Sequence, residues 1–248
     1  MIPAWLAFYD GMIAIALFLA GILGAHFYLV APLVGFQMAM IWGLVISLLG
    51  TIFGVVAIIR THAPMRAAGR PRAKVGLIMS LIVFVPIVVL VLSGIKYPGI
   101  NDITTDFSNP PEFKHAQTLA GNHGRDLKYN ASHYMEAQQK GYPPLAPLHL
   151  SAPPAAAFAQ VKQAAAAMPT WTITSTDDAA MTLEGVSTSR LFHFQDDFVI
   201  QVRPADGGGS LIEMRSKSRD GIGDFGVNYN RIVSFFKKLS AAAQPAAS

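Results

Sequence analysis

The sequence predicts an α+β protein in which three N-terminal transmembrane helices are followed by a small antiparallel-sheet domain with flanking helices. Three observations support this prediction: three long apolar stretches near the N-terminus, a basic segment between the second and the third, and alternating apolar and polar residues near the C-terminus. The chain of 248 residues is 52% apolar and only 14% charged. The first value lies above the usual globular range and the second below it, which favours a membrane protein.

Each apolar stretch is long enough for a helix that crosses the hydrocarbon core of a bilayer, which takes about 20 residues. The stretches run roughly from Gly11 to Val30, from Met38 to Ile59 and from Val75 to Ile95. The first is too long for a signal peptide and lacks the basic flank of one, so we expect it to be retained. Residues 1–95 are therefore the predicted membrane domain.

The segment Arg60–Lys74 contains no acidic residue. Its basic residues are Arg60, Arg66, Arg70, Arg72 and Lys74. Because basic residues near span ends are retained in the cytoplasm, the N-terminus is predicted to be cytoplasmic and the C-terminal domain periplasmic, in a bacterial inner membrane. The five charges of this segment less that of Asp10 give the formal net charge of +4, since the part from Lys96 onward is neutral. The basic character thus reports topology and argues against a nucleic-acid partner.

Small residues recur at intervals of four in the second apolar stretch, a spacing that lets helix backbones approach closely in lipid. They are Gly43, Ser47, Gly50, Thr51 and Gly54. We expect them to pack against the chain's own helices, and contact with a helix of a partner stays open. Asp10 and His26 lie near span ends, where we expect them to reach interfacial water.

The part after the third stretch divides by composition. Residues 96–153 are rich in proline, which disfavours helix interiors and central strands, so we expect an extended arm that wraps the domain. A short helix is expected between Ser132 and Lys140. The predicted α+β domain covers residues 154–240, and the low-complexity end, residues 241–248, is predicted to be a mobile tail.

The domain is predicted to begin with a helix, because Ser151 followed by Pro153 and Pro154 resembles a helix start, and Pro169 is expected to end it. Alternation then indicates paired strands on either side of Asp177 and Asp178. The next alternating run reads as a hairpin, or as one bent strand, with Asp196 and Asp197 at the bend.

A glycine-rich turn, a strand and a helix complete the predicted domain. The turn is Gly207–Ser210, and Ile212–Ser218 alternates as a strand should. Asp224 or Asn228 is expected to cap the final helix. Its apolar face comprises Ile232, Phe235, Phe236 and Leu239. This order of helix, four or five antiparallel strands and helix predicts helices packed on one sheet face.

Basic residues recur at alternate positions near the end of the last strand. Arg215, Lys217 and Arg219 therefore share one face, with Arg203 on a neighbouring strand. Guanidinium groups bind phosphate or carboxylate through two hydrogen bonds, so this row is a candidate site for an anion such as a lipid headgroup. The alternative is a structural ion-pair network. The acids available for it are Glu184, Glu213, Asp220 and Asp224.

No metal site and no cofactor are predicted. The chain has no cysteine, which excludes thiolate nucleophiles and thiolate metal sites. Asp196 and Asp197 could surround a divalent cation together with Asp102 or Asp106, but the chain has no loop with the spacing of such ligands. We interpret the pair as turn residues that bind arginine.

No catalytic residue is predicted either. A hydrolase could be assembled from Ser216 or Ser218 with His193 and Asp196. The chain lacks a G-x-S-x-G motif, however, and serines that alternate along a strand are poorly placed for this chemistry.

Several stretches resemble the domain of unknown function 1499, in the same order along the chain. They include FQDDFVIQVRP from Phe194 and RSKSRDGIGDFGVNYNRI from Arg215, and the resemblance covers roughly Pro98 to Leu239. The three spans are similar to those of membrane-anchored members. The positions that we interpret as structural in these motifs are Asp196, Asp197, Asp224, Asn228 and Arg231. The resemblance implies a fold and no reaction.

From these observations we expect a non-catalytic accessory or assembly subunit of a membrane protein complex that displays a periplasmic domain. Its expected partners are membrane lipid and another integral membrane protein. Two alternatives stay open: a binding module for an anionic lipid or small anionic ligand, and an uncharacterised hydrolase.

Overall fold

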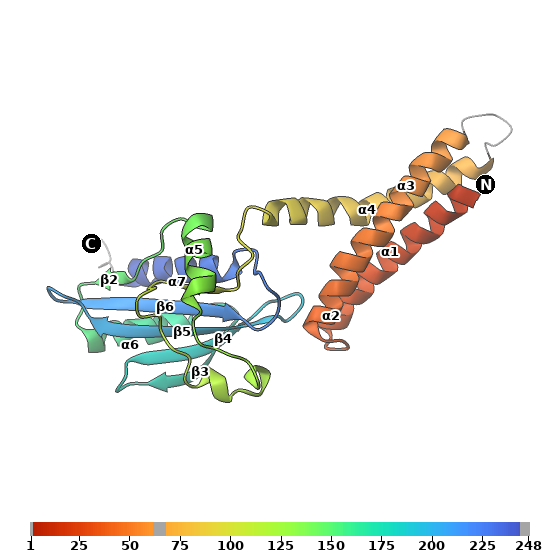
Figure 1. Cartoon of the computed structure of the whole chain (residues 1–248). Coiled ribbons are helices and arrows are strands. Elements are labelled where there is room, and N and C mark those ends of the chain that lie inside the picture. The colour runs from red at the N-terminus through yellow and green to blue at the C-terminus, as the bar shows by residue number, and fades with distance from the viewer. Residues whose placement is uncertain (1, 62–67, 244–248) are drawn as a thin grey trace, which may run out of the picture. The chain divides into compact units, whose positions relative to one another are not determined.

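The structure is a computed structural model that describes residues 2–61 and 68–243, and the chain divides near Ile95 into a helical unit and a sheet-containing domain. Figure 1 shows the helices α1 to α4 in the first unit, and the sheet with its helices in the second. The predicted α+β class is confirmed.

The helical unit contains three helices that are long and apolar enough to cross a membrane. They are α1 (Ile2–His26), the continuous helix Pro32–Arg60 and α4 (Arg70–Gly94), with mean hydropathies of 2.1, 2.4 and 3.1. The second consists of α2 (Pro32–Phe36), a π-helical turn (Gln37–Trp42) and α3 (Gly43–Arg60). The three predicted spans are therefore present as helices.

The helices begin earlier than the apolar stretches from which they were predicted, and α1 ends at His26, before the predicted Val30. Residues 32–37, which lie between the first two predicted stretches, are helical, because proline is compatible with the first turn of a helix. Arg70, Arg72 and Lys74 lie in the first turns of α4, not in a loop. Long basic side chains can extend from a helix end to water, so the helix can continue past the apolar stretch. Arg66 lies outside the described residues.

Small residues on α3 lie against the chain's other helices. A Cβ atom at Gly54 would approach the Cβ atom of Leu77 on α4 to 2.8 Å. Gly50 lies against Ser80 of α4 and Asp10 of α1. Close backbone approach of this kind needs glycine at the contact. Three further residues were predicted to pack in this way. Gly43 lies near Val83 and Ile87, and Ser47 is buried. The Thr51 hydroxyl donates a hydrogen bond to the Ser47 carbonyl of its own helix.

The domain is built on an antiparallel sheet with the strand order β1-β6-β5-β4-β3, and β2 pairs with β6 beside β1. The strands are β1 (Asp102–Thr104), β2 (Leu148–Leu150), β3 (Trp171–Asp177), β4 (Thr182–Thr188), β5 (Gln195–Pro204) and β6 (Ser210–Ser218). The helices are α5 (Ala131–Gly141), α6 (Pro154–Ala166) and α7 (Val227–Ala243), with 3₁₀ turns at Ala116–Thr118 and Ala120–Asn122.

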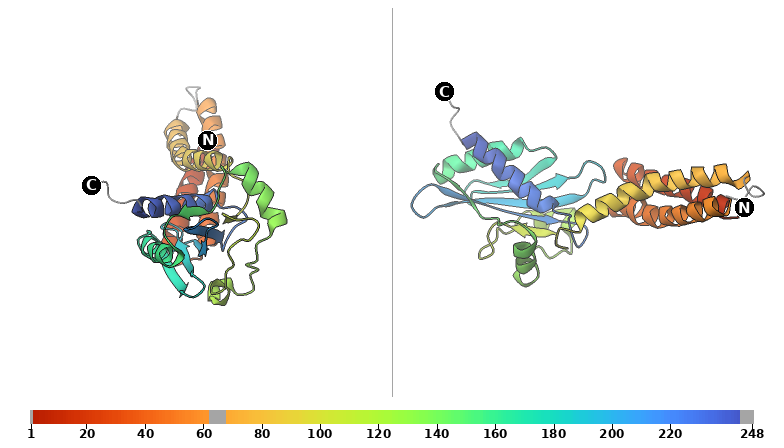
Figure 2. Two further views of the ribbon diagram at one scale, coloured as in Figure 1. Left: turned by 90° about the vertical axis from the view of Figure 1, so that its left-hand side faces the viewer. Right: turned by 90° about the horizontal axis from the view of Figure 1, so that it is seen from above.

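Helices α6 and α7 cover one face of the sheet, as the two views in Figure 2 show. Phe198 and Met214 point from the sheet into this layer, and Ile232 and Phe235 of α7 meet them. The ring of Trp171 lies 4.0 Å from that of Phe198, centroid to centroid. Burial of these large side chains supplies the main apolar core of the domain.

The proline-rich arm forms part of the same sheet. It contributes β1 and β2, which pair with β6, and it contributes α5, which contains the predicted short helix. Three-residue strands fit between the prolines, and each gives the outer side of β6 a hydrogen-bonded neighbour. Residues 241–243 belong to α7, and residues 244–248 of the predicted tail lie outside the described residues.

One local prediction is wrong. Asp196 and Asp197 lie inside the uninterrupted strand β5 and are buried, whereas they were expected at a bend. Phe192 and Phe194 precede the strand. Aspartate disfavours strands in general, but here each carboxylate is neutralised by an arginine of another element, so the strand continues through both.

Helix packing in the first unit predicts opposite effects for two matched substitutions. Gly54→Ala should destabilise the bundle by about 1–3 kcal/mol, because its methyl group would overlap Leu77. Gly43→Ala meets its nearest atoms at 3.6 Å or more and should be neutral or stabilising by up to about 1 kcal/mol. Thermal unfolding of the two variants in detergent measures the difference, and equal midpoints would contradict the packing described.

Candidate functional site

The candidate site is the face of the sheet opposite α6 and α7, which the arm covers. Alternation along β6 points Arg215 and Lys217 toward this face and Ser216 toward the helices. The arm places a small apolar cluster over the same face, formed by Phe113, Ala116, Leu127 and Val199. Charged side chains on this face are thus removed from water and need partners.

Asp102, on the outer strand β1, binds two basic residues of β6 on this face. It lies directly opposite Lys217 in the pairing of β1 with β6. Its two oxygens accept hydrogen bonds from Arg215, from Nε at 2.8 Å and from Nη2 at 2.7 Å. Lys217 Nζ donates to the same carboxylate at 2.9 Å. One fully buried carboxylate therefore neutralises two cations, and the paired bonds to arginine are of the strong, charge-assisted kind.

The guanidinium group of Arg215 binds partners within the protein. Beyond Asp102, its Nη2 donates to the Leu127 carbonyl at 2.8 Å. Its guanidinium lies over the rings of Phe113 and Tyr129, at 4.8 and 5.3 Å from their centroids. With 1% of the residue exposed, it has no open side for a ligand.

Asp197 forms a second centre on the same face. Arg219 donates to it through Nε and through Nη2 at 2.7 Å, and Asn122 of the arm donates at 3.0 Å. Arg125 Nη1 lies 3.6 Å from it and Arg125 also donates to the Ser218 carbonyl. The arm is therefore held to the sheet by the carboxylate of a central strand.

Two glutamates complete the face. Glu184 on β4 accepts three backbone hydrogen bonds from the arm, at residues 114, 115 and 116, and so holds the first turn of a 3₁₀ helix. Glu213 on β6 binds Arg203, which also contacts Asp106 at 4.0 Å. The four basic residues of the predicted anion site thus share a face, and each has a carboxylate partner within the chain.

The opposite face carries a smaller polar group beneath α7. Asp196 forms an ion pair with Arg231, and Ser216 donates to Asn228 at 2.7 Å. Arg231 in turn donates to Ser216. The Ser216 hydroxyl therefore donates to an amide oxygen, whereas a serine nucleophile needs an adjacent base to take up its proton.

Asp224 precedes α7 and holds its first turn. Its oxygens accept from the backbone N–H groups of Gly226 at 2.9 Å and Asn228 at 2.8 Å, which agrees with the predicted capping role. Burial raises the pKa of this carboxyl above its ordinary value of 3.8, and the bonds from Asn228 and Gly226 offset this only in part. Burial also raises the pKa of Tyr142, whose hydroxyl faces Asp224.

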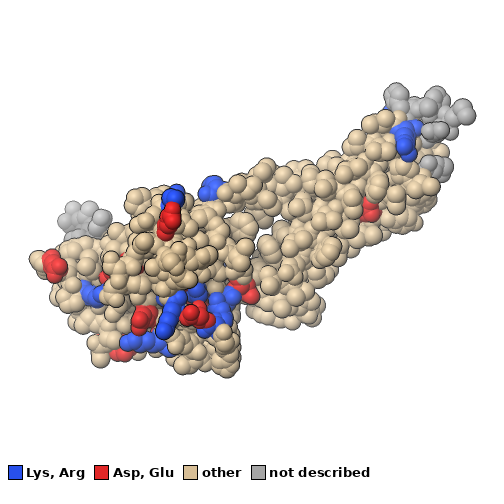
Figure 3. All heavy atoms as spheres, in the orientation of Figure 1, with Lys and Arg blue, Asp and Glu red and all other residues tan. Residues whose placement is uncertain are grey.

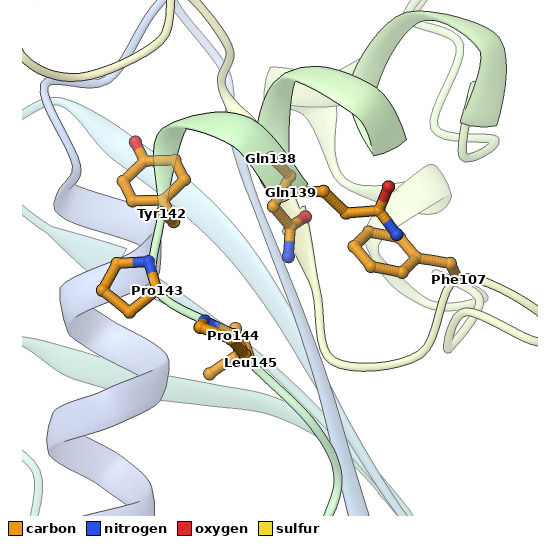
Figure 4. Close-up of a pocket in the computed structure, with 7 residues that line it drawn as sticks. All are labelled: Phe107, Gln138, Gln139, Tyr142, Pro143, Pro144 and Leu145. Carbon is orange, nitrogen blue, oxygen red and sulfur yellow. The ribbon is translucent and has the colours of Figure 1, made fainter.

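A pocket of about 290 Å³ opens beside α5. Figure 4 shows Phe107 beside Gln139, with Pro143, Pro144 and Leu145 following Tyr142. The remaining lining residue is Gln138, whose amide already has two hydrogen-bond partners. It accepts from the N–H of Thr104 and donates to the carbonyl of Thr104. The lining contains no carboxylate, lysine, arginine or histidine, so it offers no group for acid–base chemistry near neutral pH.

Basic and acidic side chains lie next to one another on the surface of the domain (Figure 3). On the face drawn in Figure 3, blue and red side chains of the domain lie next to one another, and the helices show little charge. Within the described ranges 2–61 and 68–243, no three His, Asp or Glu side chains are grouped so that they could hold a metal ion.

The sequence analysis identified the basic residues of this site. It did not identify the roles of the acidic residues or the part of the arm that covers the face. Asp102 was considered only as a possible metal ligand, and Glu184 only as a partner of arginine. Asn122 and Arg125 were missed, because nothing in the local pattern of the arm shows that it folds over Asp197. The pairing of the arm with β6 is the information that was lacking.

Comparison with known proteins adds one match. The family described as "Protein of unknown function (DUF1499)" matches residues 102–239, more than half of the chain. No curated protein and no solved structure shows significant similarity to this chain.

Loss of the charge of Asp102 should be severely destabilising. Asp102→Asn keeps the shape of the side chain but leaves Arg215 and Lys217 buried without a counter-charge, at a cost of about 3–5 kcal/mol. Chemical denaturation followed by tryptophan fluorescence measures this cost. The matched control is Asp178→Asn, which breaks an exposed pair with Lys162 and should cost less than about 1 kcal/mol. Equal denaturation midpoints for the two variants would refute the central role of Asp102.

The raised pKa of Asp224 predicts that the stability of the protein falls as the pH rises. Because its pKa is raised on folding, the native chain binds more protons than the unfolded chain just above pH 3.8. The free energy of unfolding therefore falls as pH rises through the window between 3.8 and the raised pKa. Asp224→Asn has no proton to lose there, so its stability should rise relative to the wild type across that window. Parallel stability curves for the two proteins would disprove the raised pKa.

Proposed function

The chain belongs to the DUF1499 family, whose function is unknown, and we propose that it is a non-catalytic accessory or assembly subunit of a membrane protein complex. In this proposal the three helices cross a bacterial inner membrane with the N-terminus in the cytoplasm. The sheet domain then lies in the periplasm. Basic residues at the ends of α3 and α4 support this orientation, since such residues are retained on the cytoplasmic side.

The main support for the proposal is that the charged groups on the arm-covered face form ion pairs and hydrogen bonds within the chain. Asp102, Asp197 and Glu184 each bind two or more groups of other segments. A catalytic site needs acids, bases or cations that can change partners during a reaction. Groups buried and bonded in this way instead hold one shape, which suits a domain that acts by contact.

A second candidate, a binding module for an anionic lipid or ligand, depends on Arg203. Its side chain is 29% exposed, the most among the arginines of the arm-covered face that form ion pairs. An anion could bind there by replacing Asp106, which lies 4.0 Å away. Arg203 would have to keep Glu213 neutralised at the same time. This makes the site weaker than an open cluster of arginines.

Purification from native membranes tests the proposal. The chain is tagged after Ser248, extracted in a mild detergent, and its co-purifying proteins and lipids are identified by mass spectrometry. We expect an integral membrane protein in stoichiometric amount, since an assembly subunit should stay with its complex. A chain that purifies alone, with a phospholipid bound in stoichiometric amount, would overturn the subunit proposal in favour of the binding module.

The two candidates also differ in their response to Arg203→Ala. Under the subunit proposal the lipid content of the purified protein stays unchanged, whereas a binding module loses its lipid. Lys140→Ala serves as the control, because it removes an exposed cation whose only ion pair is within its own helix.

A further inference from the structure

The search for a further site leads to the end of the sheet at which the chain enters the domain. Strand β1 pairs antiparallel with β6, Asp102 opposite Lys217, so the segment before β1 and the segment after β6 lie at the same end. The end of β4 and the start of β5 lie there as well, because Thr188 pairs with Gln195 and Asp196 with Ser218. We name the segments 96–101 and 219–227 at this end of the sheet the entry end.

Exposed apolar side chains gather at the entry end. Among the described residues of the sheet-containing domain, most of the large apolar side chains that are exposed lie at this end. They are Ile222 at 89%, Phe225 at 54% and Val227 at 48%. Isolated exposed residues need no explanation, but a group at one end of a domain marks an interaction surface.

The other end of the sheet has the opposite character. The turns there are residues 178–180 and 205–209, which consist of aspartate, alanine and glycine. At the entry end the apolar side chains are instead accompanied by an exposed basic residue, Lys96. Apolar side chains next to a positive charge favour binding to the surface of a bilayer.

The loop of Ile222 and Phe225 is held rigidly on the segment that leaves α4. Asn101 donates to the Gly221 carbonyl at 2.6 Å, and the N–H of Asp224 bonds the Ile100 carbonyl at 3.2 Å. The ring of Tyr97 lies directly against Gly226, with no room for a side chain there. The position of the loop is therefore fixed relative to residues 97–101.

Phe225 is presented outward in a conformation that phenylalanine disfavours. Its φ is +52°, in the left-handed region, and both of its neighbours are fixed. An ordinary loop would place glycine at such a position, as this loop does at Gly221 and Gly226. Backbone strain at an exposed aromatic residue points to a use for that side chain.

The length of the chain places this loop near lipid. The apolar part of α4, from Val75 to Ile95, spans about 30 Å at 1.5 Å per residue, which equals the hydrocarbon thickness. Lys96 then lies at the headgroup level. Tyr97 follows directly, and a trans peptide moves the chain only about 3.8 Å per residue. Any orientation of the domain leaves Tyr97, and the loop fixed to it, within reach of the headgroups.

We propose that the entry end is a lipid-contacting surface, in which Ile222 and Phe225 insert into the headgroup region of the bilayer that α4 crosses. Val227 borders the inserted side chains, and Lys96 binds anionic headgroups. This surface holds the domain against the membrane and sets which of its faces a partner meets. The proposal requires the three helices to span the membrane and is independent of the subunit function.

Single cysteines can test the proposal, since the chain has none of its own. Ile222→Cys and Phe225→Cys are labelled with a fluorophore in the full chain, which is reconstituted into phosphatidylcholine vesicles containing phosphatidylglycerol. Nitroxide-bearing lipids should quench both labels severalfold more than a label at Asp206→Cys, in the exposed turn at the other end of the sheet. Aqueous iodide should show the reverse order. Because the three labels share one domain, inverted insertion affects them alike.

Two outcomes would overturn the assignment to lipid. Labels at Ile222 and Phe225 that respond to both quenchers as the Asp206 label does would show that the entry end stays in water. Labels protected from iodide in native membranes but not in lipid vesicles would show that a protein covers this end. Unchanged thermal midpoints of the labelled proteins establish that each variant is folded, as expected for side chains that are exposed.

Discussion

The charge of Asp102 is the constraint on which the domain depends. A buried carboxylate is tolerated only when cations compensate it, and Arg215 and Lys217 do so from the strand beside it. The same contact fixes the register of β1 against β6, because a shift by one residue would turn Asp102 to the other face. Through Leu127 and Phe113, Arg215 also fixes the path of the arm.

A sheet with charged residues on one face normally turns that face to water. Here the arm covers it, which removes Asp197, Glu184 and Arg215 from solvent. The arm is held over this face by polar contacts, since Asn122 and Arg125 bind Asp197 and three backbone N–H groups bind Glu184. Such a covering is specific in geometry, because each group has to meet its own partner.

The two ends of the sheet in the domain differ in chemistry. The end that receives the chain carries Ile222 and Phe225, whereas the far end carries acidic and glycine-rich turns. In the proposed lipid contact, these apolar side chains lie in the headgroup region, where they do not promote aggregation in water.

The sequence by itself determined the three helices, the α+β class, the last strand and the capped last helix, since each depends on hydrophobic spacing or on a local cap that can be read along the chain. It also placed Arg203, Arg215, Lys217 and Arg219 on one face. Only the tertiary structure decided their partners, because Asp102 lies 113 positions from Arg215 along the chain. It also decided that Asp196 and Asp197 continue a strand: local propensity favours a turn there, and ion pairs with distant arginines outweigh it.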